Sequence, residues 1–366
     1  TVFTLPKGNG WCHAIDFIHK HNKEIVNLGN MRVVIPLLDD WNTKHKDGDT
    51  TQKASQIGLY YYEEIALRGG IGYRHDEKES QLIKVILNGS LEIKKELSQI
   101  FEEVLSSKDT SHREKYYPLV KTILTSITDG LEAVKNLPEY VIRLADKFWF
   151  KTPDRNNPYS REEIENYFCL NDKYDFDYFP PSALQTPVFQ LLRFAPYETV
   201  DFIISFVNKT VECYWKSGPQ YEVEEIELRV DGKDIKQYIS NRLWNAYRGT
   251  QASTSLLESI HMALEKWLLA QAKITEQNVL ENFLKYILRN SKSASITAVV
   301  ASIVMAYPEK LFNIASILFR TKELFHYDTT RIVLDQGHKS QLLGLKDFGF
   351  KNFMKELYEN ERIEAC

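Results

Sequence analysis

Two acidic residues follow an apolar run in "VVIPLLDDW", from Val33 to Trp41. An apolar strand that delivers paired acids, here Asp39 and Asp40, to a magnesium ion is the Walker B arrangement of nucleotide-hydrolysing proteins. However, Pro36 interrupts the run, and the sequence contains no GxxxxGK[ST] loop to hold phosphates. The pattern therefore favours a helix whose apolar face ends at the two acids. We expect this chain neither to bind nor to hydrolyse ATP.

A second group of reactive side chains lies in "CHAIDFIHKH". Cys12, His13, Asp16 and His19 are all residue types that bind zinc. Their spacing drifts around a helix, and the HExxH spacing of helical zinc sites is absent. The pattern is typical of a solvated helix end, so we predict no metal and no cofactor.

The cysteines and the remaining histidine candidate also favour structural roles. Cys12, Cys169, Cys213 and Cys366 are far apart and form no CxxC pair, which predicts reduced thiols and no zinc knuckle or disulfide framework. Cys213 and His261 stand among apolar residues of helical patterns, where a packed side chain is more common than a nucleophile or base. Because no GxSxG motif is present either, we expect that the chain is not an enzyme.

Composition sets the class of protein. The chain has 366 residues, 43% of them hydrophobic, which is enough to bury a sizeable core. Its formal net charge of -4 gives no support to nucleic-acid binding. No apolar stretch approaches the ~18 residues that cross a bilayer. These properties predict a cytoplasmic protein without a membrane partner.

The elements that must position any site are helices of roughly 12–20 residues joined by short polar turns. The pattern breaks between residues 151 and 187, which are rich in Pro, Asn, Asp and Tyr. We predict a mainly α fold, an irregular α-solenoid or stacked helical pairs, with an N-terminal half (1–150), an irregular connection (151–187) and a C-terminal half (188–366). The start without Met and the charged helical end predict a piece of a longer protein.

One helix and one hairpin are predicted within the C-terminal half. The residues from Ile296 to Ala306 are apolar all round the helix, which indicates a central helix surrounded by neighbours. Residues 223–239 read as two strands around Asp231-Gly232, a two-residue type I′ turn.

That turn fixes a register for the hairpin. Val230 faces Lys233, Arg229 faces Asp234, Leu228 faces Ile235 and Glu227 faces Lys236. The same register places the apolar residues on one face, which must be covered because a lone hairpin is marginally stable in water. We expect the helix from Ser255 to Ala270, the nearest amphipathic helix in the sequence, to cover it.

The hairpin leads into "NRLWNAYRGT", where Arg242, Trp244, Tyr247 and Arg248 lie within seven residues. These residue types dominate interface hot spots, and Arg stacked on an aromatic ring is also a common brace inside proteins. Both roles stay open, the brace being favoured, with Trp244 buried and Arg242 or Arg248 pairing with nearby carbonyls or acids.

Four runs in residues 194–328 carry a family resemblance: "FAPYETVDFIISFVNKTVECYWKS", "RLWNAYRGT", "HMALEKWLL" and "SASITAVVASIVMAYPEKLFNIASILFRTKELFHYD". They resemble the helical-repeat region of very large bacterial ATP-binding proteins of the antiviral STAND NTPase type. In that class a helical array senses a phage protein or holds the inactive state, while an NTPase core and an effector lie elsewhere. The resemblance therefore implies the array alone and no active-site residue.

Three functions remain open at this point. The first is a non-catalytic helical scaffold or ligand-sensing segment of a larger bacterial antiviral signalling ATPase, whose protein partner is a phage protein or another part of the same large chain. The second is a free-standing helical-repeat adaptor. The third is a helical enzyme or metalloprotein with an unrecognised site.

Overall fold

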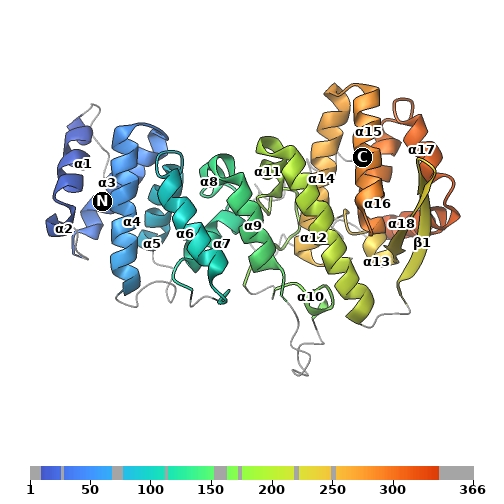
Figure 1. Ribbon diagram of the computed structural model, residues 1–366, viewed down its shortest axis with the longest axis horizontal. Helices are drawn as coiled ribbons and strands as arrows, with labels where there is room; N and C mark the ends of the chain where they lie inside the picture. The colour runs from blue at the N-terminus through green and yellow to red at the C-terminus, as the bar shows by residue number, and fades with distance from the viewer. Residues whose placement is uncertain are drawn as a thin grey trace. The chain divides into compact units, whose positions relative to one another are not determined.

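The computed structural model describes residues 10–25, 29–67, 77–111, 114–151, 163–171, 175–217, 222–248 and 253–337. These residues form 18 helices and one two-stranded antiparallel sheet (Figure 1). The prediction of a mainly helical fold with one inserted hairpin is therefore confirmed. The chain divides into two compact units, residues 1–148 and 149–366.

Helices account for the regular structure of the described part of the first unit. They are α1 (Gly10–Lys20), α2 (Asn22–Ile25), α3 (Met31–Lys44), α4 (Asp49–Leu67), α5 (Glu77–Asn88), α6 (Lys94–Ser106), α7 (Tyr117–Thr125), α8 (Leu131–Asn136) and α9 (Pro138–Trp149), whose last residue belongs to the second unit. Helix α5 is central, because α3, α4, α7 and α8 all contact it. Gly58 of α4 permits one close approach: a Cβ there would lie 3.0 Å from Cγ1 of Val85.

A buried polar side chain ties the three central helices together. Asn42 of α3 donates from Nδ2 to Ser55 Oγ of α4 at 2.9 Å and to the carbonyl of Val85 in α5 at 2.8 Å. Asp39 lies in the same helix as Asn42, so the run that resembles a Walker B strand is helical as predicted. Pro36 is inside this helix.

The second unit contains the hairpin. Its elements are α10 (Ile164–Tyr167), α11 (Val188–Phe194), α12 (Pro196–Ser217), β1 (Glu224–Val230), β2 (Lys233–Ile239), α13 (Asn241–Trp244), α14 (Ser255–Ile274), α15 (Gln277–Asn290), α16 (Ala294–Ala306), α17 (Phe312–Leu318) and α18 (Lys322–Gly337). None of the helices in the described ranges of either unit is both long and apolar enough to span a membrane.

Helix α16 forms the middle of this unit, as its apolar sequence predicts. It contacts α13, α14, α15, α17 and β2. Its side chains are buried on every side from Ala294 to Val300, and only Met305 and Ala306 at its end are exposed. An all-round apolar surface is stable only when neighbours enclose the helix, which is what the fold supplies.

The hairpin has the predicted turn and register. Asp231 and Gly232 both have positive φ, 47° and 80°, as the two central residues of a type I′ turn require. Leu228 pairs with Ile235 and Arg229 with Asp234, as expected. On the outer face the Lys236 ammonium binds Glu225 at 2.7 Å, a diagonal neighbour, instead of Glu227 directly opposite.

The prediction that the helix from Ser255, α14, covers the hairpin is wrong. Strand β1 packs against α15 and α17, and β2 packs against α16, so the main cover is not α14. Two further contacts fix the position: Tyr238 N donates to the Lys292 carbonyl at 2.8 Å, and Lys285 of α15 binds the Asp231 carboxylate at 3.2 Å. Proximity in sequence was a poor guide, because α14 faces α11 and α16.

Two cysteines that are 44 residues apart in the sequence meet in the second unit. Cys169 and Cys213 form a disulfide with their Cα atoms 5.9 Å apart. It ties the segment after α10 to α12, and the Phe168 ring stacks on Tyr214 of α12 beside it, with ring centroids 4.3 Å apart. The prediction of reduced thiols is therefore wrong for this pair, whereas Cys12 is free.

Candidate functional site

The Arg and aromatic cluster after the hairpin begins with the short helix α13. Ser240 caps this helix, its Oγ accepting a hydrogen bond from Leu243 N at 3.1 Å. Trp244 and Tyr247 follow, and each is only 2% exposed. Burial to this extent leaves these two rings little surface for an external partner.

Helix α18 supplies the polar partners of the two rings. Trp244 Nε1 donates to Asp328 Oδ1 at 3.3 Å. The same carboxylate binds the Arg331 guanidinium at 2.8 Å, and Arg331 also donates to the Tyr247 hydroxyl. Burial raises the pKa of the Tyr247 hydroxyl, while the nearby Arg331 and Arg248 oppose this effect. Arg331 is 7% exposed, so its hydrogen bond to Tyr247, together with the one from Trp244 to Asp328, connects α13 and the turn after it to α18.

A buried glutamate completes the cluster. Glu265 of α14 is 4% exposed and accepts a hydrogen bond from the Ser302 hydroxyl of α16. Burial raises the pKa of Glu265 to about 7, against the opposing effects of the Ser302 hydrogen bond, Arg248 and Arg331. The Arg248 guanidinium lies over the Tyr247 ring, 5.6 Å from its centroid.

Arg242 lies apart from these residues. It acts on the Tyr214 hydroxyl of α12, where burial raises the pKa and Arg242 lowers it. The Tyr214 hydroxyl also lies 3.1 Å from the Glu222 carboxylate. The structure therefore brings Trp244, Tyr247 and Arg248 together and places Arg242 against a different helix.

We name Trp244, Tyr247, Glu265, Asp328 and Arg331 the polar cluster; all of them are buried except Asp328, which is half-buried. Its members come from α13, the turn after it, α14 and α18, so its geometry suits a brace that joins separate helices. Sequence reasoning missed Glu265, Asp328 and Arg331. The i, i+3 spacing of Asp328 and Arg331 is a signal for an ion pair, but exposed helix surfaces carry the same spacing.

Glu265 should make the stability of the second unit pH-dependent. A carboxyl whose pKa is raised on folding stabilises the fold while it is protonated. This contribution is complete below the unfolded pKa of about 4.5 and is lost as the pH rises through about 7. We expect Glu265→Gln, which keeps the neutral shape, to gain stability relative to the parent between pH 5 and pH 8.

Urea unfolding of both proteins across this pH range measures the effect. Glu323→Gln, in the first turn of α18 at a half-buried position, is the control and should show no such pH-dependent difference. A constant difference between Glu265→Gln and the parent across the range would contradict the assignment.

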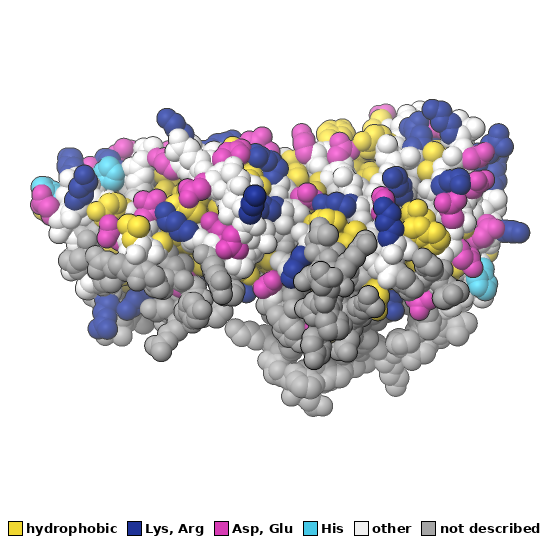
Figure 2. Space-filling model, turned by 60° about the horizontal axis from the view of Figure 1, so that its bottom comes forward, with side chains coloured by type: hydrophobic (Ala, Val, Ile, Leu, Met, Phe, Trp, Pro, Cys, Tyr) yellow, Lys and Arg dark blue, Asp and Glu magenta, His cyan; other side chains and the backbone are white. Residues whose placement is uncertain are grey.

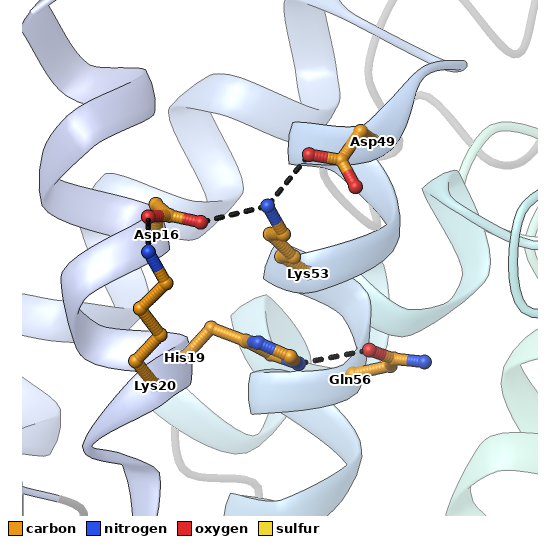
Figure 3. Close-up of polar contacts among 6 residues, drawn as sticks. All are labelled: Asp16, His19, Lys20, Asp49, Lys53 and Gln56. Carbon is orange, nitrogen blue, oxygen red and sulfur yellow. Dashed lines mark hydrogen bonds and ion pairs between the residues drawn. The ribbon is translucent and has the colours of Figure 1, made fainter.

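Two of the four residues with zinc-ligand chemistry in α1, Asp16 and His19, contact side chains of α4. The Asp16 carboxylate binds Lys53 of α4 at 2.7 Å and Lys20 of its own helix at 2.7 Å (Figure 3). These two lysines, Lys20 first, lower the pKa of Asp16 to about 2. His19 Nε2 lies 2.9 Å from Gln56 Oε1. Throughout the described ranges, no three His, Cys, Asp or Glu side chains gather in a way that could hold a metal ion.

His261 is packed inside the second unit. Its Nδ1 donates to the Leu257 carbonyl at 2.6 Å, which leaves Nε2 to accept from the Ser295 hydroxyl at 2.8 Å. Burial lowers the pKa of His261 to about 4. A neutral imidazole that is 1% exposed has no access to a substrate, so this histidine is a core residue as predicted.

An exposed aromatic pair is formed by one residue directly after α17 and one residue of α18. Phe319 and Phe325 are 65% and 48% exposed, and their rings stack with centroids 5.6 Å apart. Arg320 and Lys322 are exposed beside them in the sequence. On the face that Figure 2 draws, Lys and Arg side chains are interspersed with Asp and Glu.

Comparison with models of protein families finds no match, and neither does comparison with curated proteins. The site is therefore interpreted from its own residues.

Proposed function

We propose that this chain is a non-catalytic helical scaffold that binds a protein partner through Phe319 and Phe325. The observation that carries the proposal is the exposure of two stacked rings, Phe319 directly after α17 and Phe325 in α18. Large apolar side chains in the open mark interaction surfaces, and aromatic side chains dominate binding energy there. The exposed Arg320 and Lys322 favour a partner whose apolar side chain is flanked by acidic residues.

A non-catalytic role has support from the candidate reactive groups. Asp16 is paired with two lysines, His261 is enclosed, and Cys213 is in a disulfide. The surroundings of each of these three side chains therefore fit a structural role.

The wider setting rests on the resemblance alone. It places this scaffold as the sensing segment of a bacterial antiviral STAND-type ATPase in the cytoplasm, with a phage protein or another part of the same chain as partner. The cytoplasm keeps thiols reduced, so in this setting the disulfide between Cys169 and Cys213 would be exposed to reduction. A GxxxxGK[ST] loop in the reading frame upstream would support this setting.

Loss of the aromatic pair should abolish partner binding without unfolding the chain. In quantitative co-purification from extracts of the source cells, the Phe319→Ser/Phe325→Ser variant is expected to recover at least roughly tenfold less partner, because truncating a hot-spot side chain costs about 2 kcal/mol or more. Circular dichroism should be unchanged. Leu67→Ser, which removes a 79% exposed apolar side chain from the first unit, is the control. Equal recovery by the double variant and the parent would exclude this surface.

A further inference from the structure

The second unit contains a cavity of about 570 Å³ between the end of α9, α10 with the residues that follow it, residues 176–179 and the start of α14. Its volume is within the range of small-molecule sites. Neither Phe319 nor Phe325 lines the cavity, so it is separate from the proposed protein surface. The aromatic and aliphatic side chains of its described lining are Trp149, Ile164, Leu170, Phe176, Tyr178, Phe179 and Leu256.

Three aromatic rings of the lining hold one another in place. Trp149 Nε1 donates to the Tyr178 hydroxyl at 2.7 Å, and the two rings are nearly perpendicular, with centroids 6.0 Å apart. The Phe176 ring lies parallel to Tyr178, with centroids 6.3 Å apart. An aromatic wall that is fixed before binding lowers the entropy cost of ordering a flat ring against it.

The start of α14 supplies hydrogen-bond donors to the other side of the cavity. Thr254 caps this helix with its hydroxyl oxygen, and the Glu258 carboxylate accepts from Ser253 N at 2.8 Å. Ser255 and Leu256 follow in the first turn, and both line the cavity. A helix offers no carbonyl of its own to the amides of its first turn, and its dipole is positive there. This side of the cavity therefore favours an oxygen acceptor.

An unpaired hydroxyl at the same place points independently to a ligand. Ser253 lines the cavity and is 6% exposed, and its Oγ has no hydrogen-bond partner among the described residues. A buried hydroxyl without a partner is costly, so a bound acceptor here would recover a hydrogen bond.

We propose that this cavity binds a small aromatic carbonyl compound. The ring of the ligand packs against Trp149, Phe176 and Tyr178. Its carbonyl oxygen accepts a hydrogen bond from the Ser253 hydroxyl, beside the first turn of α14.

Titration of the parent chain and of Ser253→Ala with acetophenone, followed by NMR across the millimolar range, tests the proposal. Ethylbenzene is the matched probe, since it has the same shape without the oxygen. We expect saturable acetophenone binding by the parent and about fivefold weaker binding by Ser253→Ala, the size of one net hydrogen bond. Ethylbenzene should bind both proteins equally. Because the lost hydroxyl has no partner in the free chain, the melting temperature of Ser253→Ala should not fall.

Three results would overturn the proposal. They are no saturable acetophenone binding by the parent chain, unchanged acetophenone binding by Ser253→Ala, or an equal loss of both probes in that variant. The Phe319→Ser/Phe325→Ser variant should bind acetophenone as the parent does. Its behaviour separates a failure of the cavity from a failure of the protein surface.

Discussion

Replacing Val300 with Asp is expected to unfold the second unit. Val300 is 0% exposed in the middle of α16, and four helices and β2 contact this helix. A carboxylate forced into that interior costs several kcal/mol, which is a large part of the roughly 5–15 kcal/mol that stabilises a typical domain. Far-UV circular dichroism during urea unfolding measures the loss.

Met305→Asp is the matched control for this substitution. Met305 belongs to the same helix and is 52% exposed, so a charge there remains in water and should change stability little. If Val300→Asp unfolds at the same urea concentration as the parent, α16 is not the centre of the unit.

The second large effect is expected from Leu228→Asp in the hairpin. Leu228 is 0% exposed on the face of β1 that packs against α15 and α17. A charge on this face would detach the hairpin, and with it the chain leading to Trp244 and Tyr247. We expect a loss of several kcal/mol in the free energy of unfolding, the size typical of an unpaired buried charge, together with loss of partner recovery.

Glu227→Ala separates packing from docking. Glu227 is exposed on the opposite face, one residue away, so its replacement should leave both the melting temperature and partner recovery unchanged. A Leu228→Asp variant that melts like the parent but recovers no partner would show that the hairpin is itself a docking element.

Features set by neighbours in the sequence could be predicted. The Asp231-Gly232 turn fixes the pairing of Leu228 with Ile235, because a two-residue loop permits one register. The central position of α16 follows from its composition, since a helix that is apolar all round has to be enclosed. Trp244, which follows the hairpin, was also expected to be buried, and it is 2% exposed.

Pairings between distant residues were not predictable. Asp328 bonds to Trp244, and Arg331 bonds to Tyr247, each across 84 residues of sequence. The i, i+3 spacing of Asp328 and Arg331 is also common on exposed helices, so it does not indicate a buried contact. The disulfide joins two cysteines without a CxxC spacing. A cavity of the second unit is lined by residues from four places between Trp149 and Leu256, none of which forms a motif alone.

The sequence by itself determined the helical class, the hairpin with its register and the enclosed helix α16, because local spacing and turn chemistry specify each of them. Only the tertiary structure decided that α15, α16 and α17, not α14, cover the hairpin, and that Glu265 and Arg331 are buried. The reason is physical: an amphipathic helix shows that it needs a partner, but many helices offer a similar apolar face. Which one it receives depends on how all the elements pack at once.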